Sequence, residues 1–192
     1  MRTHLVRRLV AAAVLTTGTL VATVVPTPNA IAAPPAGGWA PAATATIHPG
    51  VQMVTSGAQC TANFIFTRGT DVLIGYAAHC AGTGTATETN GCDSGSLPLG
   101  TIVEIDGASQ PGTLVYSSWL AMQAAGETDA NTCAYNDLAV VKVAAADVGK
   151  VNPSIPHWGG PTGLNTTGNP LLSQLYTYGN SSLRFGVSSG SP

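Results

Sequence analysis

Residues 76–80 read Tyr-Ala-Ala-His-Cys, and the prediction of the fold starts from this stretch. It ends an apolar run that begins at Val72, and it places His79 beside a cysteine. Residues 61–67 form a second candidate strand, and the two runs are separated by Arg-Gly-Thr-Asp at 68–71, which is turn chemistry. We therefore predict a β-hairpin that delivers His79 just past its end.

The first 33 residues have the layout of a secretory signal peptide. Three arginines fall within residues 1–8, an apolar stretch covers 9–25, and Ala30-Ile31-Ala32 fits the small-x-small cleavage rule. The alternative is a membrane anchor, but an apolar stretch of 17 residues rich in Thr and Ala is short for spanning a bilayer. We therefore expect a secreted protein.

Removal of this segment leaves an acidic protein. Four basic residues remain against nine acidic ones, so the net charge is 4 − 9 = −5. Nucleic acids and anionic lipids both reward a basic patch, so we expect neither as a partner once the signal is removed. The remaining chain of about 160 residues is long enough for one domain with a core, and the sequence sets no oligomeric state.

All four cysteines lie after the proposed signal peptide. An even number in an exported chain indicates two disulfides, and four cysteines allow three connectivities. No pair of cysteines has the two-to-four-residue spacing of a zinc site, so no metal and no cofactor are expected. The cysteines are Cys60, Cys80, Cys92 and Cys133, and the scattered histidines are His4, His48, His79 and His157.

Asp137 stands at the mouth of the short, nearly continuous apolar run Leu138–Val143, for which we predict a strand buried on both faces. An aspartate there is costly unless a partner satisfies it. His79 can be that partner, because the carboxylate accepts from one ring nitrogen and leaves the other free as a base. Taken singly, such a histidine is more commonly a half-buried structural residue satisfied by the backbone, and such an aspartate is more commonly a strand cap or a turn residue.

The surrounding residues favour the paired role. Cys-Thr-Ala-Asn-Phe at 60–64, Ala-Ala-His-Cys at 77–80 and Asn-Asp-Leu-Ala-Val-Val-Lys-Val at 136–143 occur in this order. Together they resemble the chymotrypsin-like (trypsin-like) serine peptidases, most closely their secreted bacterial branch, over roughly residues 50–187. The resemblance implies an all-β, chymotrypsin-like double β-barrel, with His79 and Asp137 as catalytic residues. It also implies the disulfides Cys60–Cys80 and Cys92–Cys133.

The resemblance calls for a nucleophilic serine as well. In this family it comes from a Gly-Asp-Ser-Gly segment after the aspartate, and the chain contains none. Ser94, in Cys-Asp-Ser-Gly-Ser at 92–96, precedes Asp137, so we interpret it as part of a disulfide-bearing surface turn. Ser188, Ser189 and Ser191 follow the aspartate too soon and lack a preceding Gly-Asp.

We therefore expect a chain truncated before its nucleophile, oxyanion hole and specificity pocket, and inactive as given. The predicted layout is a signal peptide at 1–33, an extended lead-in or propeptide at 34–50, and a first β-barrel at 51–150. An inter-barrel linker at 151–170 and the start of an incomplete second barrel at 171–192 follow. No long helix is predicted: residues 113–122 are expected to form a strand, 127–136 a loop, and 174–179 and 183–187 two further strands.

The expected function is that of a secreted serine endopeptidase lineage. Such an enzyme hydrolyses peptide bonds in a protein or peptide substrate through an acyl-enzyme intermediate. The alternative is a non-catalytic secreted binding module built on half of a peptidase fold.

Overall fold

The computed structural model describes residues 34–85, 88–156, 158–160, 163, 165–182 and 185–190. The predicted signal peptide, together with His4, His157 and Ser191, lies outside these residues. Among the residues described, no helix combines the length and the apolar character needed to cross a membrane.

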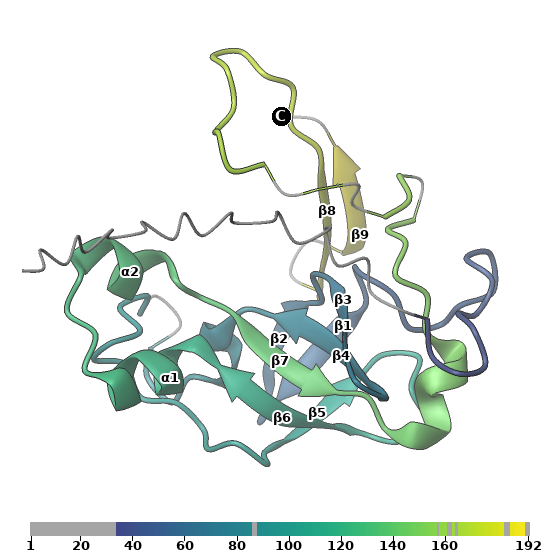
Figure 1. The fold of residues 1–192 in the computed structure, drawn as a ribbon, viewed down its shortest axis with the longest axis horizontal. Coiled ribbons are helices and arrows are strands. Elements are labelled where there is room, and N and C mark those ends of the chain that lie inside the picture. The colour runs from purple at the N-terminus through teal and green to yellow at the C-terminus, as the bar shows by residue number, and fades with distance from the viewer. Residues whose placement is uncertain are drawn as a thin grey trace, which may run out of the picture.

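A seven-stranded antiparallel sheet is the main element of the described chain, whose regular structure is mostly β as predicted (Figure 1). In spatial order its strands are β2 (Ala58–Thr61), β1 (Gln52–Thr55), β5 (Ile102–Ile105), β6 (Gly112–Ser117), β7 (Ala139–Lys142), β4 (Asp71–Tyr76) and β3 (Ile65–Arg68). β8 (Thr177–Ser181) and β9 (Gly186–Gly190) pair with each other in a separate two-stranded sheet.

The two outer strands of the large sheet belong to one bent segment, residues 58–68. Its first half pairs with β1 and its second half with β4. Between the halves, the Ala62 N–H donates to the Val51 carbonyl, and the Asn63 N–H donates to the Gly75 carbonyl. A Cβ at Gly75 would collide with the side chain of Asn63, so glycine permits this close approach. The sheet therefore closes on itself, as in a barrel.

The hairpin predicted ahead of His79 is confirmed. β3 and β4 pair antiparallel, with Ile65 opposite Ile74, and the short 3-10 helix η1 (Ala78–Ala81) follows directly. The hydrogen bond from Lys142, 2.6 Å from the Asp71 carboxylate, holds the pKa of Asp71 below its usual value, and Arg68 adds to this effect. The turn between the strands is thus tied to the neighbouring strand β7.

β1 and β2 form a second hairpin, which was not predicted from the sequence. Its two turn residues, Ser56 (φ 48°) and Gly57 (φ 88°), both have positive φ. Positive φ at both central positions is the signature of a type I′ turn, whose twist suits a two-residue hairpin. Serine is unusual at such a position, so the turn gives a weak sequence signal.

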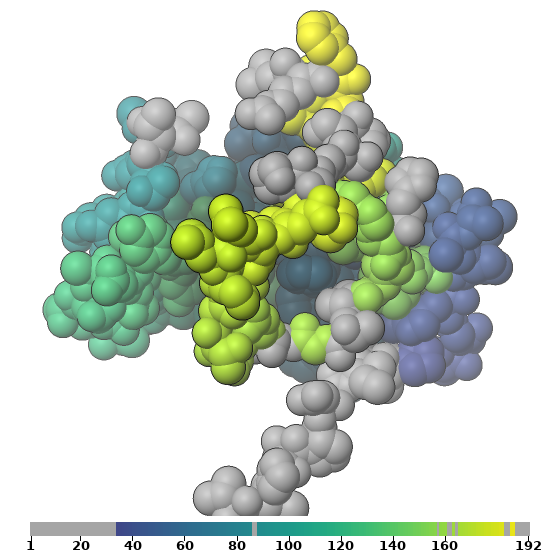
Figure 2. Space-filling view, turned by 90° about the horizontal axis from the view of Figure 1, so that it is seen from above, coloured from purple at the N-terminus to yellow at the C-terminus, as the bar shows by residue number. Residues whose placement is uncertain are grey.

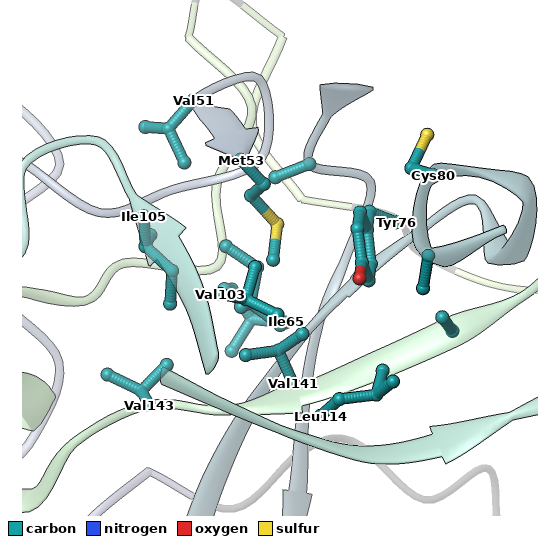
Figure 3. Close-up of a cluster of buried hydrophobic side chains, with 14 of the residues drawn as sticks. Val51, Met53, Ile65, Tyr76, Cys80, Val103, Ile105, Leu114, Val141 and Val143 are labelled. Atoms are coloured by element: carbon teal, nitrogen blue, oxygen red, sulfur yellow. The ribbon is translucent and has the colours of Figure 1, made fainter. Parts of the chain in front are cut away.

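The core lies inside the closed sheet. Figure 3 shows Met53, Ile65, Val103 and Val141 reaching into one cluster from four different strands, and all four are buried. Tyr76 lies in the same cluster, and its hydroxyl is 2.9 Å from Thr55 Oγ1. Burial raises the pKa of Tyr76, and the hydrogen bond with Thr55 offsets this only in part. The strand that leads to His79 is therefore anchored from within.

The predicted strand at 113–122 is confirmed only in its first half, which is β6, and two short helices replace its second half and part of the predicted loop at 127–136. α1 (Ser118–Ala125) follows β6 and ends at Gly126, whose φ of 65° is left-handed. Its sequence is rich in Ala, Leu, Met and Gln, which are good helix formers, but the apolar content reads equally well as a strand. α2 (Ala130–Tyr135) is capped by Asp129, whose carboxylate accepts the N–H of Thr132. This hydrogen bond lowers the pKa of the Asp129 carboxyl.

The prediction that residues 138–143 are buried on both faces is wrong. Ala139 and Val141 are fully buried in β7, but Lys142 is exposed and pairs with Asp71. A closed sheet has a single inner face, so only alternate residues of β7 enter the core. Val140 on the outer face is partly buried, which explains why the run is apolar.

The segments on either side of the sheet are fastened to it. Ile47, in the predicted lead-in, is fully buried, and its carbonyl accepts from the Asn152 N–H. At the other end, Asn180 of β8 donates its N–H to Thr61 Oγ1 and accepts from Gln52 and Gln59. The segment preceding β8 (yellow-green) stands away from the sheet in Figure 1 and lies in front of the molecule in Figure 2, and its Leu171 and Leu172 are almost fully exposed.

The double barrel stays a prediction. Of residues 171–192, those described form only the β8–β9 hairpin and its approach. The observed strands are displaced from the predicted ones by three residues at each start, to Thr177 and Gly186.

Asp147 lies in the 3-10 helix η2 (Ala145–Lys150), which follows β7, and its side chain is fully buried. Burial alone would raise the pKa of its carboxyl. Hydrogen bonds from Lys150 (2.7 Å), from the Ser109 N–H and hydroxyl, and from the Gln110 N–H outweigh that effect, and the pKa of Asp147 lies well below its usual range. The ionised carboxylate thus joins the β5–β6 turn to η2.

This arrangement makes stability depend on pH. An unfolded aspartate has a pKa of about 3.9, so stabilisation by Asp147 is complete above that value and is lost as the pH falls through the lower folded pKa. We expect Asp147→Asn to lower the free energy of unfolding at neutral pH by about 1–3 kcal/mol. The variant should also show a flatter decline of stability toward about pH 3 in urea unfolding.

Asp106→Asn is the matched control. Asp106 is exposed in the same turn, and its side chain makes no hydrogen bond within the described residues, so the change should stay within about 0.5 kcal/mol. An Asp147→Asn variant whose stability declines with pH as steeply as the parent's would show that this carboxylate is not the source.

Candidate active site

The sheet brings the two predicted site residues to one edge. β4 and β7 are antiparallel neighbours, with Tyr76 at the end of β4 opposite Ala139 at the start of β7. His79 comes three residues after Tyr76, and Asp137 two residues before Ala139. Both chain segments therefore leave the sheet at the same place, although 58 residues separate the two side chains.

The carboxylate of Asp137 engages His79 with both oxygens. Oδ2 lies 2.6 Å from the ring Nδ1, and Oδ1 accepts the backbone N–H of His79 at 2.8 Å. The first contact fixes the ring orientation and the second fixes the backbone that carries the ring. With Nδ1 donating to the carboxylate, the proton of the neutral ring stays on Nδ1, and Nε2 keeps a free lone pair.

The ring is accessible from outside. The side chain of His79 is 40% exposed and that of Asp137 is 30% exposed. Nε2 lies 4.0 Å from the Cys60 sulfur, and among the described residues no hydroxyl forms a hydrogen bond with it. Nε2 is therefore available to an incoming group.

Ser118 is a positioning residue that sequence analysis missed. It is fully buried at the start of α1, and its Oγ donates to the Asn136 carbonyl at 2.7 Å and accepts the Leu138 N–H at 3.0 Å. Its own N–H donates to the Leu138 carbonyl. One side chain thus holds the backbone on both sides of Asp137. Nothing in the sequence separates this serine from its neighbour Ser117.

Both implied disulfides are present. Cys60 pairs with Cys80, with Cα atoms 6.2 Å apart, and Cys92 pairs with Cys133, with Cα atoms 5.2 Å apart. The first bond ties β2 to the residue after His79, so it fixes the loop that carries the ring. It also brings two sulfurs and an imidazole together, which cysteine spacing alone does not predict: the ligand atoms of Cys60, His79 and Cys80 lie within 4.8 Å of one another.

The described serines considered as nucleophiles lie in the loop after Cys92 and in β9. Ser94 is buried in the Cys92 loop, where its hydroxyl donates to the Asn90 carbonyl and its carbonyl accepts from Gln123. The predicted turn is present, but Ser94 is buried in it rather than at the surface, and its carbonyl joins the turn to Gln123 of α1. Ser188 and Ser189 lie in β9, opposite Gly179 and Tyr178 of β8.

Comparison of the chain with protein-family models gives no match, and comparisons with curated proteins and with solved structures give none either. The function is therefore inferred from the chemistry of the site.

The support of Asp137 by Ser118 can be tested by substitution. We expect Ser118→Ala to lower the free energy of unfolding by about 1–3 kcal/mol, because the part-buried Leu138 N–H loses its acceptor and the Asn136 carbonyl loses its donor. Ser117→Ala is the matched control. Ser117 is equally buried, but its Oγ has no hydrogen-bond partner in the described part of the chain, so its loss should be neutral or slightly stabilising.

Urea unfolding of the two variants at neutral pH measures both effects. Equal losses in the two variants would mean that the hydroxyl of Ser118 contributes nothing beyond its volume.

Proposed function

We propose that this chain carries the general base and the orienting carboxylate of a secreted serine endopeptidase of the chymotrypsin-like type. One observation carries the proposal: Asp137 holds Nδ1 of His79 at 2.6 Å while Nε2 stays accessible. In acyl transfer, the base removes the proton of an attacking hydroxyl and later returns it to the leaving amine. The carboxylate stabilises the imidazolium that forms in between.

Several features of the scaffold support this assignment. General bases act only within hydrogen-bond reach of their proton donor, so a rigid mount favours the role. Here His79 is held by the disulfide at Cys80 and by two hydrogen bonds to Asp137. Ser118 in turn holds the backbone on both sides of Asp137. The two disulfides also fit an oxidising, extracellular environment, in keeping with the signal-like first 33 residues.

The nucleophile comes from outside the described residues. No described hydroxyl bonds Nε2, Ser94 is engaged elsewhere, and Gly-Asp-Ser-Gly does not occur in the sequence. Removing the serine of such a triad costs on the order of a millionfold in rate. We therefore propose that the 192 residues by themselves do not hydrolyse peptides, and that the substrate is a protein or peptide once a nucleophile is supplied.

One observation favours the second candidate, a non-catalytic secreted binding module that takes a protein partner. The approach to β8 exposes large apolar side chains near the Trp158–Tyr176 contact, whose ring centroids are 5.5 Å apart. Exposed apolar side chains gathered in one segment mark interaction surfaces. The residues are Leu171, Leu172, Leu175 and Tyr176.

A fluorophosphonate probe, which labels activated serines covalently, distinguishes the two candidates. We expect no labelling of the 192-residue chain. If the reading frame continues past residue 192, we expect the extended product to be labelled, at a rate that should fall by a factor on the order of 10⁶ with His79→Ala. Labelling is read by mass spectrometry.

Ser94→Ala is the control, and it should leave labelling of the extended product unchanged. Labelling of the 192-residue chain, at Ser94 in particular, would contradict the proposal that the nucleophile lies elsewhere. An extended product that stays unlabelled would contradict the peptidase assignment and favour the binding module.

A further inference from the structure

The accessible Nε2 of His79 lies beside the disulfide between Cys60 and Cys80. Its Nε2 lies 4.0 Å from the Cys60 Sγ, and the Cys80 Sγ completes a group of three ligand atoms within 4.8 Å of one another. While the two sulfurs are bonded to each other they are poor ligands, because metals bind the thiolate. The cluster therefore has two chemical states, and the state of the disulfide decides between them.

We propose that reduction of the Cys60–Cys80 disulfide converts this cluster into a binding site for a thiophilic divalent cation of the zinc class. Two thiolates and the imidazole Nε2 are the protein ligands, and the fourth position is open to solvent. Three protein ligands with one open position is an arrangement that zinc uses in proteins.

The distances fit such a site. Tetrahedral zinc has Zn–S of about 2.3 Å and Zn–N of about 2.0 Å, which corresponds to sulfur–nitrogen separations of about 3.5 Å. The Cys60–His79 separation of 4.0 Å is already close to this value. The two sulfurs must move apart to about 3.8 Å. The Cα atoms are 6.2 Å apart, which leaves room for the sulfurs to separate by rotation of the two cysteine side chains.

Asp137 orients the imidazole of His79 for binding a cation through Nε2. Histidines that bind metals almost always donate their other ring N–H to a carboxylate or carbonyl, which fixes the tautomer and raises the basicity of the ligand nitrogen. Here Oδ2 of Asp137 already holds Nδ1 at 2.6 Å, so Nε2 is preset as the ligand. Cys60 is partly exposed and the His79 ring is 40% exposed, so a cation reaches the site from solvent.

The chemistry balances with an external dithiol as reductant. The dithiol supplies two electrons and two protons to the sulfur–sulfur bond and leaves as its own cyclic disulfide. Cation binding then releases the two thiol protons to solvent as both sulfurs become thiolates. The cation occupies Nε2, so the base is blocked. This inhibitory consequence rests on the proposed peptidase function, whereas cation binding itself does not.

Cobalt(II) titration of the 192-residue chain tests the proposal. The chain is reduced with a trialkylphosphine, which takes oxygen from water and becomes the phosphine oxide. We expect one cobalt per reduced chain, a near-ultraviolet thiolate-to-cobalt charge-transfer band and the strong visible bands of tetrahedral cobalt. The oxidised chain should show none of these. His79→Gln should abolish the tetrahedral visible bands, and Asp137→Asn should weaken affinity by about 10- to 100-fold.

Differential alkylation separates this site from the other cysteine pair without a further variant. Cobalt should protect Cys60 and Cys80 from iodoacetamide and leave Cys92 and Cys133 reactive, with far-ultraviolet circular dichroism reporting whether the sheet persists. Protection of Cys92 and Cys133 instead, or spectra unchanged by His79→Gln, would overturn the proposal. A reduced chain that loses its β-signal and takes up no cobalt would overturn it as well. None of these readouts depends on peptidase activity.

Discussion

The carboxylate of Asp137 is the contact on which the site depends. One of its oxygens contacts the ring Nδ1 of His79, and the other accepts the backbone N–H of the same residue. The carboxylate therefore sets both the orientation of the ring and the position of the loop that carries it. It also joins the end of β4 to the start of β7, two strands that are already paired. A proton on Nδ1 and a free Nε2 follow from this one interaction.

The rest of the fold keeps that interaction in place. The closed sheet brings both segments to one edge, and the disulfide at Cys80 fixes the residue after His79. Ser118 holds the backbone on both sides of Asp137 from a fully buried position. Rigid mounting of this kind serves a base and serves a metal ligand equally well, since both need one nitrogen held in one direction. Under the two proposals made above, the oxidation state of the neighbouring cysteines decides which role is open to His79.

The parts predicted from the sequence are those with a local signal. The β3–β4 hairpin is marked by turn residues between two apolar runs. An aspartate placed before a strand suggests a partner for its carboxylate, and the resemblance of the surrounding segments to a peptidase family favours His79 as that partner. Closure of the sheet depends on Asn63 meeting Gly75, and the clamp depends on Ser118 rather than Ser117. Both features arise from tertiary packing, and no local sequence pattern predicts either of them. α1 was not predicted, because a short apolar segment is compatible with a strand as well as with a helix.

Nitrogen-15 NMR of the histidine rings tests the central interaction directly. For the ring of His79 in the neutral state, the account predicts a protonated Nδ1, with a far-downfield proton shielded from exchange by the Asp137 carboxylate, and an unprotonated Nε2. In Asp137→Asn that downfield proton signal should disappear while the fold persists. A His79 ring that carries its proton on Nε2, or a spectrum that Asp137→Asn leaves unchanged, would contradict the account.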